Sequence, residues 1–251
     1  MKMSGNAILD QMSTGNKDDG KMNESKTTAR LVGVLFIIGT VAGILSVLIT
    51  GSIFSGSDYL VKVFENQNQI VTGALCILVM GLSLALVPVV VYPILKKHNR
   101  TLALGYVVFR GALETFSVLF TVMAYLLLII LSRENANAAV SDASYFKNTG
   151  TLLLDGMDYF GAIAAIIFSL GALMLYYVFY KSKLIPRWLS GWGVAAAILY
   201  LAAGVSIMYS FDLSILQFVM LPQEMVMAAW LIIKGFNPIA IASAPAKPKT
   251  N

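Results

Sequence analysis

The chain has 251 residues, and 58% of them are hydrophobic. Only 12% are charged, about half the usual ~25% of soluble proteins. With a mean hydropathy of +0.77, this composition excludes a soluble globular domain, a disordered chain and a disulfide scaffold. It indicates a polytopic helical membrane protein. The net charge of +5 does not suggest nucleic acid as a partner, because the basic residues lie beside apolar segments and membrane topology explains them.

Residues 1–29 are polar and are predicted to be a disordered cytoplasmic tail. The six apolar runs that come after them can each cross a bilayer core of ~30 Å. Because they are continuously apolar rather than alternating, they predict helices and not a β-barrel. We expect an all-α domain over 30–237 and a cytoplasmic C-terminal tail over 238–251. The predicted spans are 30–54, 70–95, 101–131, 153–180, 189–210 and 214–235.

The basic residues predict the orientation of the bundle. With both termini on one side, that side carries fourteen of the 18 Lys and Arg residues, and Arg110 lies inside a helix. Because cytoplasmic loops carry the excess of Lys and Arg, both termini are predicted to be cytoplasmic. The three basic residues on the other side are Lys62, Arg133 and Lys147.

Three charged residues lie inside predicted helices. Arg110 and Glu114 are four residues apart in the third span and share one face, and Glu224 lies in the sixth. A charge inside a bilayer costs about 2.5–3.5 kcal/mol, so each needs a partner or a wet cavity. Arg110 is about 15 Å along its helix from Arg100 at the cytoplasmic edge, and Glu224 is equally far from Lys234. Because these two helices run in opposite directions, we predict an Arg110–Glu224 contact.

Two neighbours extend this candidate site. Tyr106 lies one turn before Arg110 on the same face, and Gln223 adjoins Glu224. We therefore take Arg110, Glu114, Glu224, Gln223 and Tyr106 as candidates for binding a ligand or a proton. One carboxyl is in excess, and a proton or a cation would neutralise it. The sequence leaves a second interpretation open, in which the charges only hold two helices together.

The sequence carries none of the motifs of familiar hydrolytic or nucleotide chemistry. HExxH, GxSxG, the full phosphate-binding motif GxxxxGK(S/T) and a cysteine pair are all missing from it. Cys76 is the single cysteine and His98 the single histidine, so no metal-ligand spacing exists. We expect neither a metal site nor a cofactor.

Several segments together resemble a bacterial membrane family catalogued as domain of unknown function 4386. The resemblance spans about residues 29–237 and implies a multi-pass protein of a bacterial cell membrane. It rests on Ala29-Arg30, Tyr92-Pro93-Ile94-Leu95, Arg110 with Glu114, Ile185-Pro186-Arg187-Trp188-Leu189-Ser190, and Leu221-Pro222-Gln223-Glu224 followed by Ala229-Trp230-Leu231-Ile232-Ile233-Lys234-Gly235-Phe236-Asn237.

Three functional hypotheses fit these features. The first is transport of a small solute, or ligand binding, through the Arg and Glu residues, with a link to protons. The second is a membrane sensor or partner-binding protein whose charges are structural. The third, which the sequence favours least, is an intramembrane enzyme with Glu114 or Glu224 as general acid or base. The expected partners are the lipid bilayer and a small molecule, and because six helices are few for a transporter, a homo-oligomer is suggested.

Overall fold

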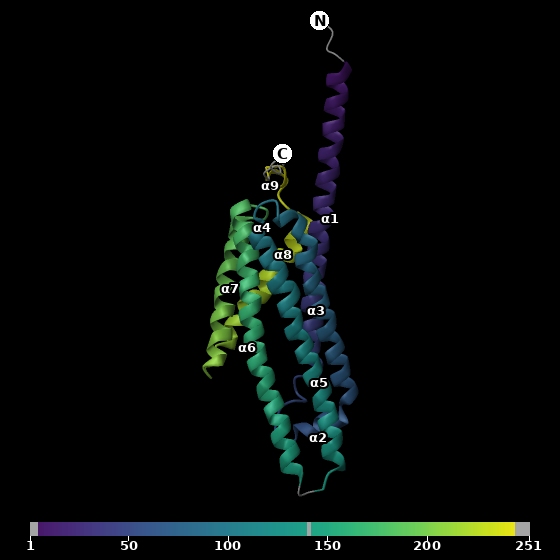
Figure 1. Ribbon diagram of the computed structural model, residues 1–251, viewed down its shortest axis with the longest axis vertical. Helices are drawn as coiled ribbons and strands as arrows, with labels where there is room; N and C mark the ends of the chain where they lie inside the picture. Colours follow the sequence, from purple (N-terminus) through teal and green to yellow (C-terminus); the bar gives the residue numbers. More distant parts are fainter. Residues whose placement is uncertain (1–4, 140–141, 244–251) are drawn as a thin grey trace.

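The computed structural model is an all-α bundle (Figure 1). The structure describes residues 5–139 and 142–243, and for residues 5–19 and 21 it describes the backbone alone. Within these ranges, six helices are long and apolar enough to cross a membrane, which confirms the predicted fold class. They cover Met22–Thr50, Gln67–Leu95, Arg100–Asn137, Ala143–Ser182, Arg187–Met208 and Ser214–Ile233.

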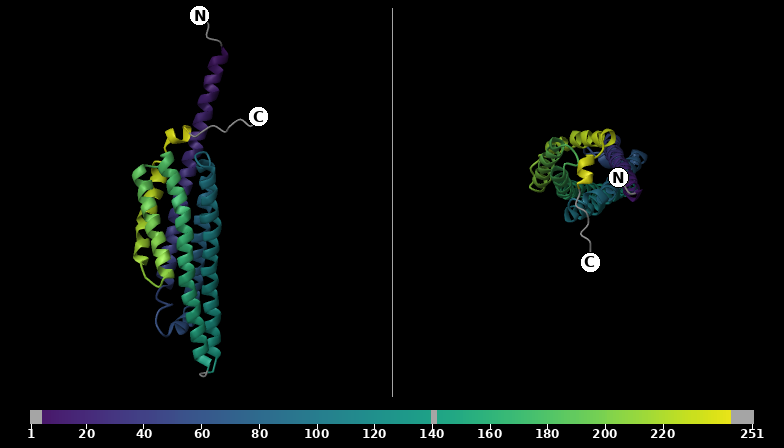
Figure 2. Two further views of the ribbon diagram at one scale, coloured as in Figure 1. Left: turned by 60° about the vertical axis from the view of Figure 1, so that its left-hand side comes forward. Right: turned by 90° about the horizontal axis from the view of Figure 1, so that it is seen from above.

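Some spans consist of more than one helical element. The third span joins α4, a π-helical segment and α5, and the sixth joins a 3-10 helix and α8. The short α9 lies over one end of the bundle (Figure 2). The elements are α1 (Gly5–Thr50), α2 (Tyr59–Glu65), α3 (Gln67–Leu95), α4 (Arg100–Tyr106), the π-helical segment (Val107–Leu113), α5 (Glu114–Asn137), α6 (Ala143–Ser182), α7 (Arg187–Met208), the 3-10 helix (Ser214–Val219), α8 (Met220–Ile233) and α9 (Pro238–Ala242).

Neighbouring spans pack side by side and close into a ring. α1 packs on α3, α3 on α5, α5 on α6, α6 on α7, α7 on α8, and α8 on α1. Short connections between antiparallel helices favour this arrangement. The third and sixth spans are therefore opposite each other in the ring, so that their buried side chains meet inside it.

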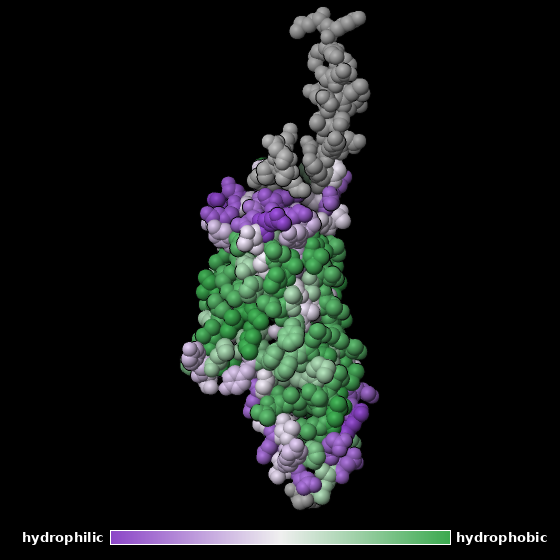
Figure 3. All heavy atoms as spheres, viewed as in Figure 1, coloured by the Kyte–Doolittle hydropathy of each residue, from purple (hydrophilic) through white to green (hydrophobic). Residues whose placement is uncertain are grey.

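An apolar belt covers the visible face of the bundle between two hydrophilic ends (Figure 3). α1 begins and α9 ends at the same end (Figure 1), as an even number of spans requires. The mostly apolar side chains of the belt suit hydrocarbon, and the helices satisfy their own backbone hydrogen bonds there. The side of the membrane that this end faces stays a prediction.

The first helix is longer than the sequence predicts. α1 begins at Gly5, so residues 5–29, the predicted disordered tail, are helical from that residue on. Extending a helix that already exists needs no new nucleation, which explains how a polar stretch can continue it. Residues 1–4 lie outside the described residues. Of the predicted C-terminal tail, the structure describes α9 and Ser243 but not residues 244–251.

A helical hairpin occupies most of residues 132–152, which lie between the third and fourth predicted spans and which the sequence therefore predicts to be a loop. α5 continues to Asn137 and α6 already begins at Ala143, so both helices extend beyond the other spans (Figure 1). Packing against α2 explains the extension. The hydroxyl of Tyr59 donates to the carbonyl of Lys147 at 2.8 Å, and Gly150 leaves room for the Tyr59 ring.

Small residues bring α1 and α3 together. A Cβ atom at Gly39 would lie 2.7 Å from the Leu84 side chain, and one at Gly43 would lie 2.8 Å from the sulfur of Met80. Transmembrane helices associate through such close van der Waals packing, because the hydrophobic effect contributes little between apolar surfaces in lipid. These two glycines therefore set how closely α1 approaches α3.

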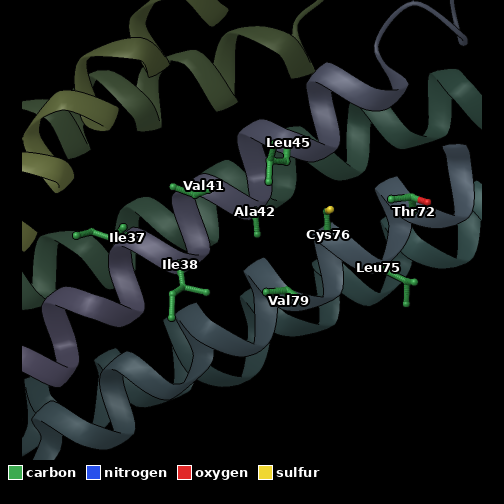
Figure 4. A pocket seen from close by; sticks show the side chains of 9 residues that line it. All are labelled: Ile37, Ile38, Val41, Ala42, Leu45, Thr72, Leu75, Cys76 and Val79. Atoms are coloured by element: carbon green, nitrogen blue, oxygen red, sulfur yellow. The ribbon is translucent and has the colours of Figure 1, made fainter.

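An outward groove of about 440 Å³ runs between the same two helices (Figure 4). Its walls are apolar except for Thr72 and the half-buried Cys76. Leu75 in the groove is 56% exposed, as expected for a side chain that contacts hydrocarbon. The groove is part of the lipid-facing belt, and neither its shape nor its residues indicate a polar ligand.

His98 lies in the turn between α3 and α4, outside the spans. Its Nε2 atom is buried without a hydrogen-bond partner among the described residues. Burial, and then the charge of neighbouring Lys97, hold the pKa of His98 below its usual value. The unfolded chain therefore binds this proton more tightly than the folded chain does.

This difference in proton affinity makes the bundle less stable in acid. The free energy of unfolding should fall as the pH drops below about 6.5, the ordinary pKa of histidine. We expect His98→Gln to remove this part of the slope. Thermal unfolding in detergent between about pH 5 and 8 checks it, and identical profiles for the variant and the wild type would contradict the prediction.

Candidate functional site

Arg110 lies inside the ring and is only 3% exposed. Its Nη1 donates to both carboxylate oxygens of Glu114, at 2.9 and 3.0 Å. Its Nη2 donates to Oε1 of Glu224 at 3.4 Å. The predicted Arg110–Glu224 contact is therefore present, and one guanidinium joins the third and sixth spans. We call these three residues the charge cluster.

Two aromatic rings lie close to the guanidinium. The centroid of Phe168 lies 4.5 Å from Cζ of Arg110, and that of Phe36 lies 6.0 Å from it. Tyr200 packs against Phe168 at 4.7 Å between centroids. A desolvated cation over an aromatic face gains about 2 kcal/mol. α1, α6 and α7 thus help to hold Arg110 in place.

The backbone at Arg110 is π-helical rather than α-helical. The amide of Glu114 donates to the carbonyl of Phe109, five residues earlier. Neighbouring helices approach this segment closely: a Cβ at Gly171 of α6 would lie 3.4 Å from the Arg110 nitrogen, and one at Gly111 would lie 3.5 Å from Pro88 of α3. π-helical turns are rare and occur frequently at functional sites.

The two carboxyl groups are less enclosed than the guanidinium. The side chains of Glu114 and Glu224 are 16% and 14% exposed, against 3% for Arg110. With all three groups ionised, the charge cluster carries one net negative charge.

Tyr106 and Gln223 have different surroundings. Tyr106 is 1% exposed and belongs to the main apolar core. Gln223 is fully buried, and its amide does not bind the charge cluster. Instead its Oε1 accepts a hydrogen bond from the Tyr176 hydroxyl at 2.6 Å, and its Nε2 donates to the Leu189 carbonyl at 3.3 Å. Gln223 thus joins α8 to α6 and α7 beside the charge cluster.

Gly193 of α7 leaves room for the Tyr176 ring. A Cβ atom at this glycine would overlap the ring carbons of Tyr176. Gly193→Ala is therefore expected to push Tyr176 away from Gln223 and to lower the free energy of unfolding by about 1–3 kcal/mol. Gly191→Ala, where a Cβ atom would meet nothing, is the control for unfolding in detergent. Equal stability of the two variants would contradict this prediction.

Sequence reasoning missed several residues around the site. Tyr176, Phe168 and Phe36 come from other helices, and nothing distinguishes them in the sequence from the other aromatic residues of apolar spans. The π-helical segment also has no local signal. Of the five predicted site residues, the structure brings Arg110, Glu114 and Glu224 into direct contact and leaves the other two beside them.

Six apolar spans around a buried charge cluster define a multi-pass membrane protein. A family model described as "Domain of unknown function (DUF4386)" matches residues 31–235. The chain belongs to this family, and the match confirms the resemblance that its sequence motifs indicate. No curated protein and no solved structure matches the chain.

Proposed function

We propose that this protein binds a small cationic solute or a proton at the charge cluster and carries it across the membrane. The observation that supports the proposal most directly is that Glu114 and Glu224 share the single guanidinium of Arg110. One negative charge is left over, and an uncompensated charge inside a bilayer costs about 2.5–3.5 kcal/mol. Binding of one positive charge removes that cost.

The geometry suggests which group receives the ligand. Arg110 forms two short hydrogen bonds with Glu114 but only one longer bond with Glu224. Glu224 is therefore the less firmly held carboxyl, and a bound cation would replace one weak bond there. The π-helical segment supports the same view, because a change of such a turn to α-helix would rotate Arg110 relative to its partners.

Sealed lipid vesicles containing the purified protein test the proposal. With a potential that is negative inside, we expect either protons or labelled small ammonium solutes to enter faster than in protein-free vesicles. Glu224→Gln should reduce the rate to that of protein-free vesicles, since it removes the acceptor. Glu134→Gln is the matched control, because Glu134 is exposed near the end of the same span as Glu114.

A second candidate, a partner-binding protein with structural charges, is favoured by a different observation. Neither the groove between α1 and α3 nor the cavity beside the α6–α7 turn contains a residue of the charge cluster. If wild-type vesicles take up neither protons nor the labelled ammonium solutes faster than protein-free vesicles do, transport is refuted and the second candidate stands.

A further inference from the structure

A basic pocket lies at the end of the bundle where α1 begins and α9 ends. Its volume is about 580 Å³, and it is formed by the turn between α6 and α7 together with the segment that joins α8 to α9. It contains Lys183, Arg187 and Lys234 but no acidic residue. The pocket is separate from the charge cluster, so its role does not depend on the proposed function.

Hydrogen bonds between the two segments hold the pocket in shape. The backbone amide of Asn237 donates to the Leu184 carbonyl at 2.9 Å, and its side-chain Nδ2 donates to the Lys183 carbonyl at 3.3 Å. Asn237 also caps α9 by accepting the amide of Ile239 at 3.1 Å. One asparagine therefore fixes both walls, and the pocket exists without a ligand to organise it.

The three cations of the pocket are exposed. None of them takes part in the salt bridges formed between described residues. The guanidinium of Arg187 lies 5.4 Å from the ring centroid of Tyr180, a contact that orients the side chain and leaves its charge uncompensated. Three positive charges around one cavity are complementary to a phosphate group, which accepts hydrogen bonds from Lys and Arg.

The position of the pocket distinguishes a lipid from a free anion. Trp230 forms part of its wall, and tryptophan is enriched at the membrane–water interface. Ile233, which directly precedes Lys234, is 74% exposed and belongs to the apolar surface of α8. A molecule with its phosphate among the cations can therefore place its hydrocarbon chain along α8. Basic pockets between transmembrane helices bind anionic head groups in this way.

We propose that the basic pocket binds the headgroup phosphate of an anionic phospholipid. Lys183, Arg187 and Lys234 would contact the phosphate, and Trp230 would pack beside the glycerol region. Bound lipid would link the α6–α7 turn to the end of α8. Because it binds only the folded protein, it should stabilise the bundle.

Thermal unfolding of the full-length protein in detergent, titrated with phosphatidylglycerol, tests this proposal. The variant combines Lys183→Asn, Arg187→Gln and Lys234→Gln. Asparagine is chosen at Lys183 because φ is +58° there, a conformation that asparagine tolerates. We expect the wild type to be stabilised by phosphatidylglycerol and the variant to bind it about tenfold more weakly or worse, since each cation near an anionic headgroup contributes to affinity.

The matched control removes three positive charges elsewhere at the same end, through Lys96→Gln, Lys97→Gln and Arg100→Gln. This variant should keep the wild-type response to phosphatidylglycerol. Phosphatidylcholine and inorganic phosphate should stabilise the wild type much less. Equal weakening in both triple variants would overturn the proposal in favour of general surface charge. An equal response to inorganic phosphate would overturn it in favour of a free-anion site, and an unchanged response of the pocket variant would overturn it outright.

Discussion

Arg110→Gln is expected to lower the free energy of unfolding by about 3–5 kcal/mol, the largest effect of any single charge substitution in this chain. The guanidinium forms three hydrogen bonds with two carboxyl groups and is 3% exposed. Removing one partner of a buried ion pair leaves the other charge without compensation. Here two carboxyl groups are left facing each other inside an apolar bundle. Equilibrium unfolding in mild detergent measures the loss.

Arg133→Gln is the matched control for this substitution. Arg133 lies in the same span and its guanidinium also donates hydrogen bonds, to Gln67, but this contact is exposed. Its loss should cost about 1 kcal/mol or less. Adding Glu114→Gln and Glu224→Gln to Arg110→Gln should recover part of the stability, because the unpaired charges are gone. Equal stability of Arg110→Gln and the wild type would refute this account of the charge cluster.

Gln223→Leu should have the second largest effect, a loss of about 2–4 kcal/mol. The substitution keeps the approximate volume but removes the 2.6 Å and 3.3 Å hydrogen bonds of the fully buried amide. The Tyr176 hydroxyl would then have no acceptor inside the bundle. An unsatisfied buried polar group lowers the free energy of unfolding by about 1–3 kcal/mol. Unfolding in detergent measures this loss as well.

The double variant Gln223→Leu/Tyr176→Phe separates the loss of the Gln223 hydrogen bonds from the cost of leaving the Tyr176 hydroxyl unpaired. Because it leaves no unpaired hydroxyl, it should be more stable than Gln223→Leu alone. Tyr176→Phe alone should fall between the wild type and Gln223→Leu. If Gln223→Leu is already as stable as the double variant, the hydroxyl is satisfied elsewhere and the proposed network is wrong.

Comparing the stability of Arg110→Gln with that of the single variant Glu224→Gln also bears on function. A large loss for Arg110→Gln with a similarly large loss for Glu224→Gln would mean that both of these charges stabilise the fold, as the second candidate requires. A neutral or stabilising Glu224→Gln would mean that this carboxylate is retained against stability. That outcome favours the proposed binding of a cation or a proton at Glu224.

Much of the fold could be predicted from apolar periodicity and length. The six predicted apolar runs correspond to the six observed spans. The sequence predicts that the third span ends at 131 and the fourth begins at 153, whereas α5 continues to Asn137 and α6 begins at Ala143. Those ends are polar and continue as helices because α2 packs against α5 and its Tyr59 donates a hydrogen bond to α6. Composition cannot reveal such support, because it comes from a segment more than 70 residues away in the chain.

The charge cluster could be predicted in part from the depth of its residues in the membrane. Arg110 and Glu114 are close because they are four residues apart, and Glu224 could be matched to them by its distance from the same membrane edge. Equal depth does not specify which way a side chain points around its helix. The closed ring of helices decided that Glu224 faces Arg110 and that Gln223 turns instead to Tyr176.

By itself, then, the sequence determined that the chain spans the membrane six times and that Arg110 and Glu224 lie at a common depth, because both follow from local hydrophobicity and helical rise. Only the tertiary structure decided the π-helical turn at Arg110, the aromatic surroundings of its guanidinium, the Gln223 network and the basic pocket. Each of these depends on contacts between helices that are distant in sequence, and such contacts have no local pattern to reveal them.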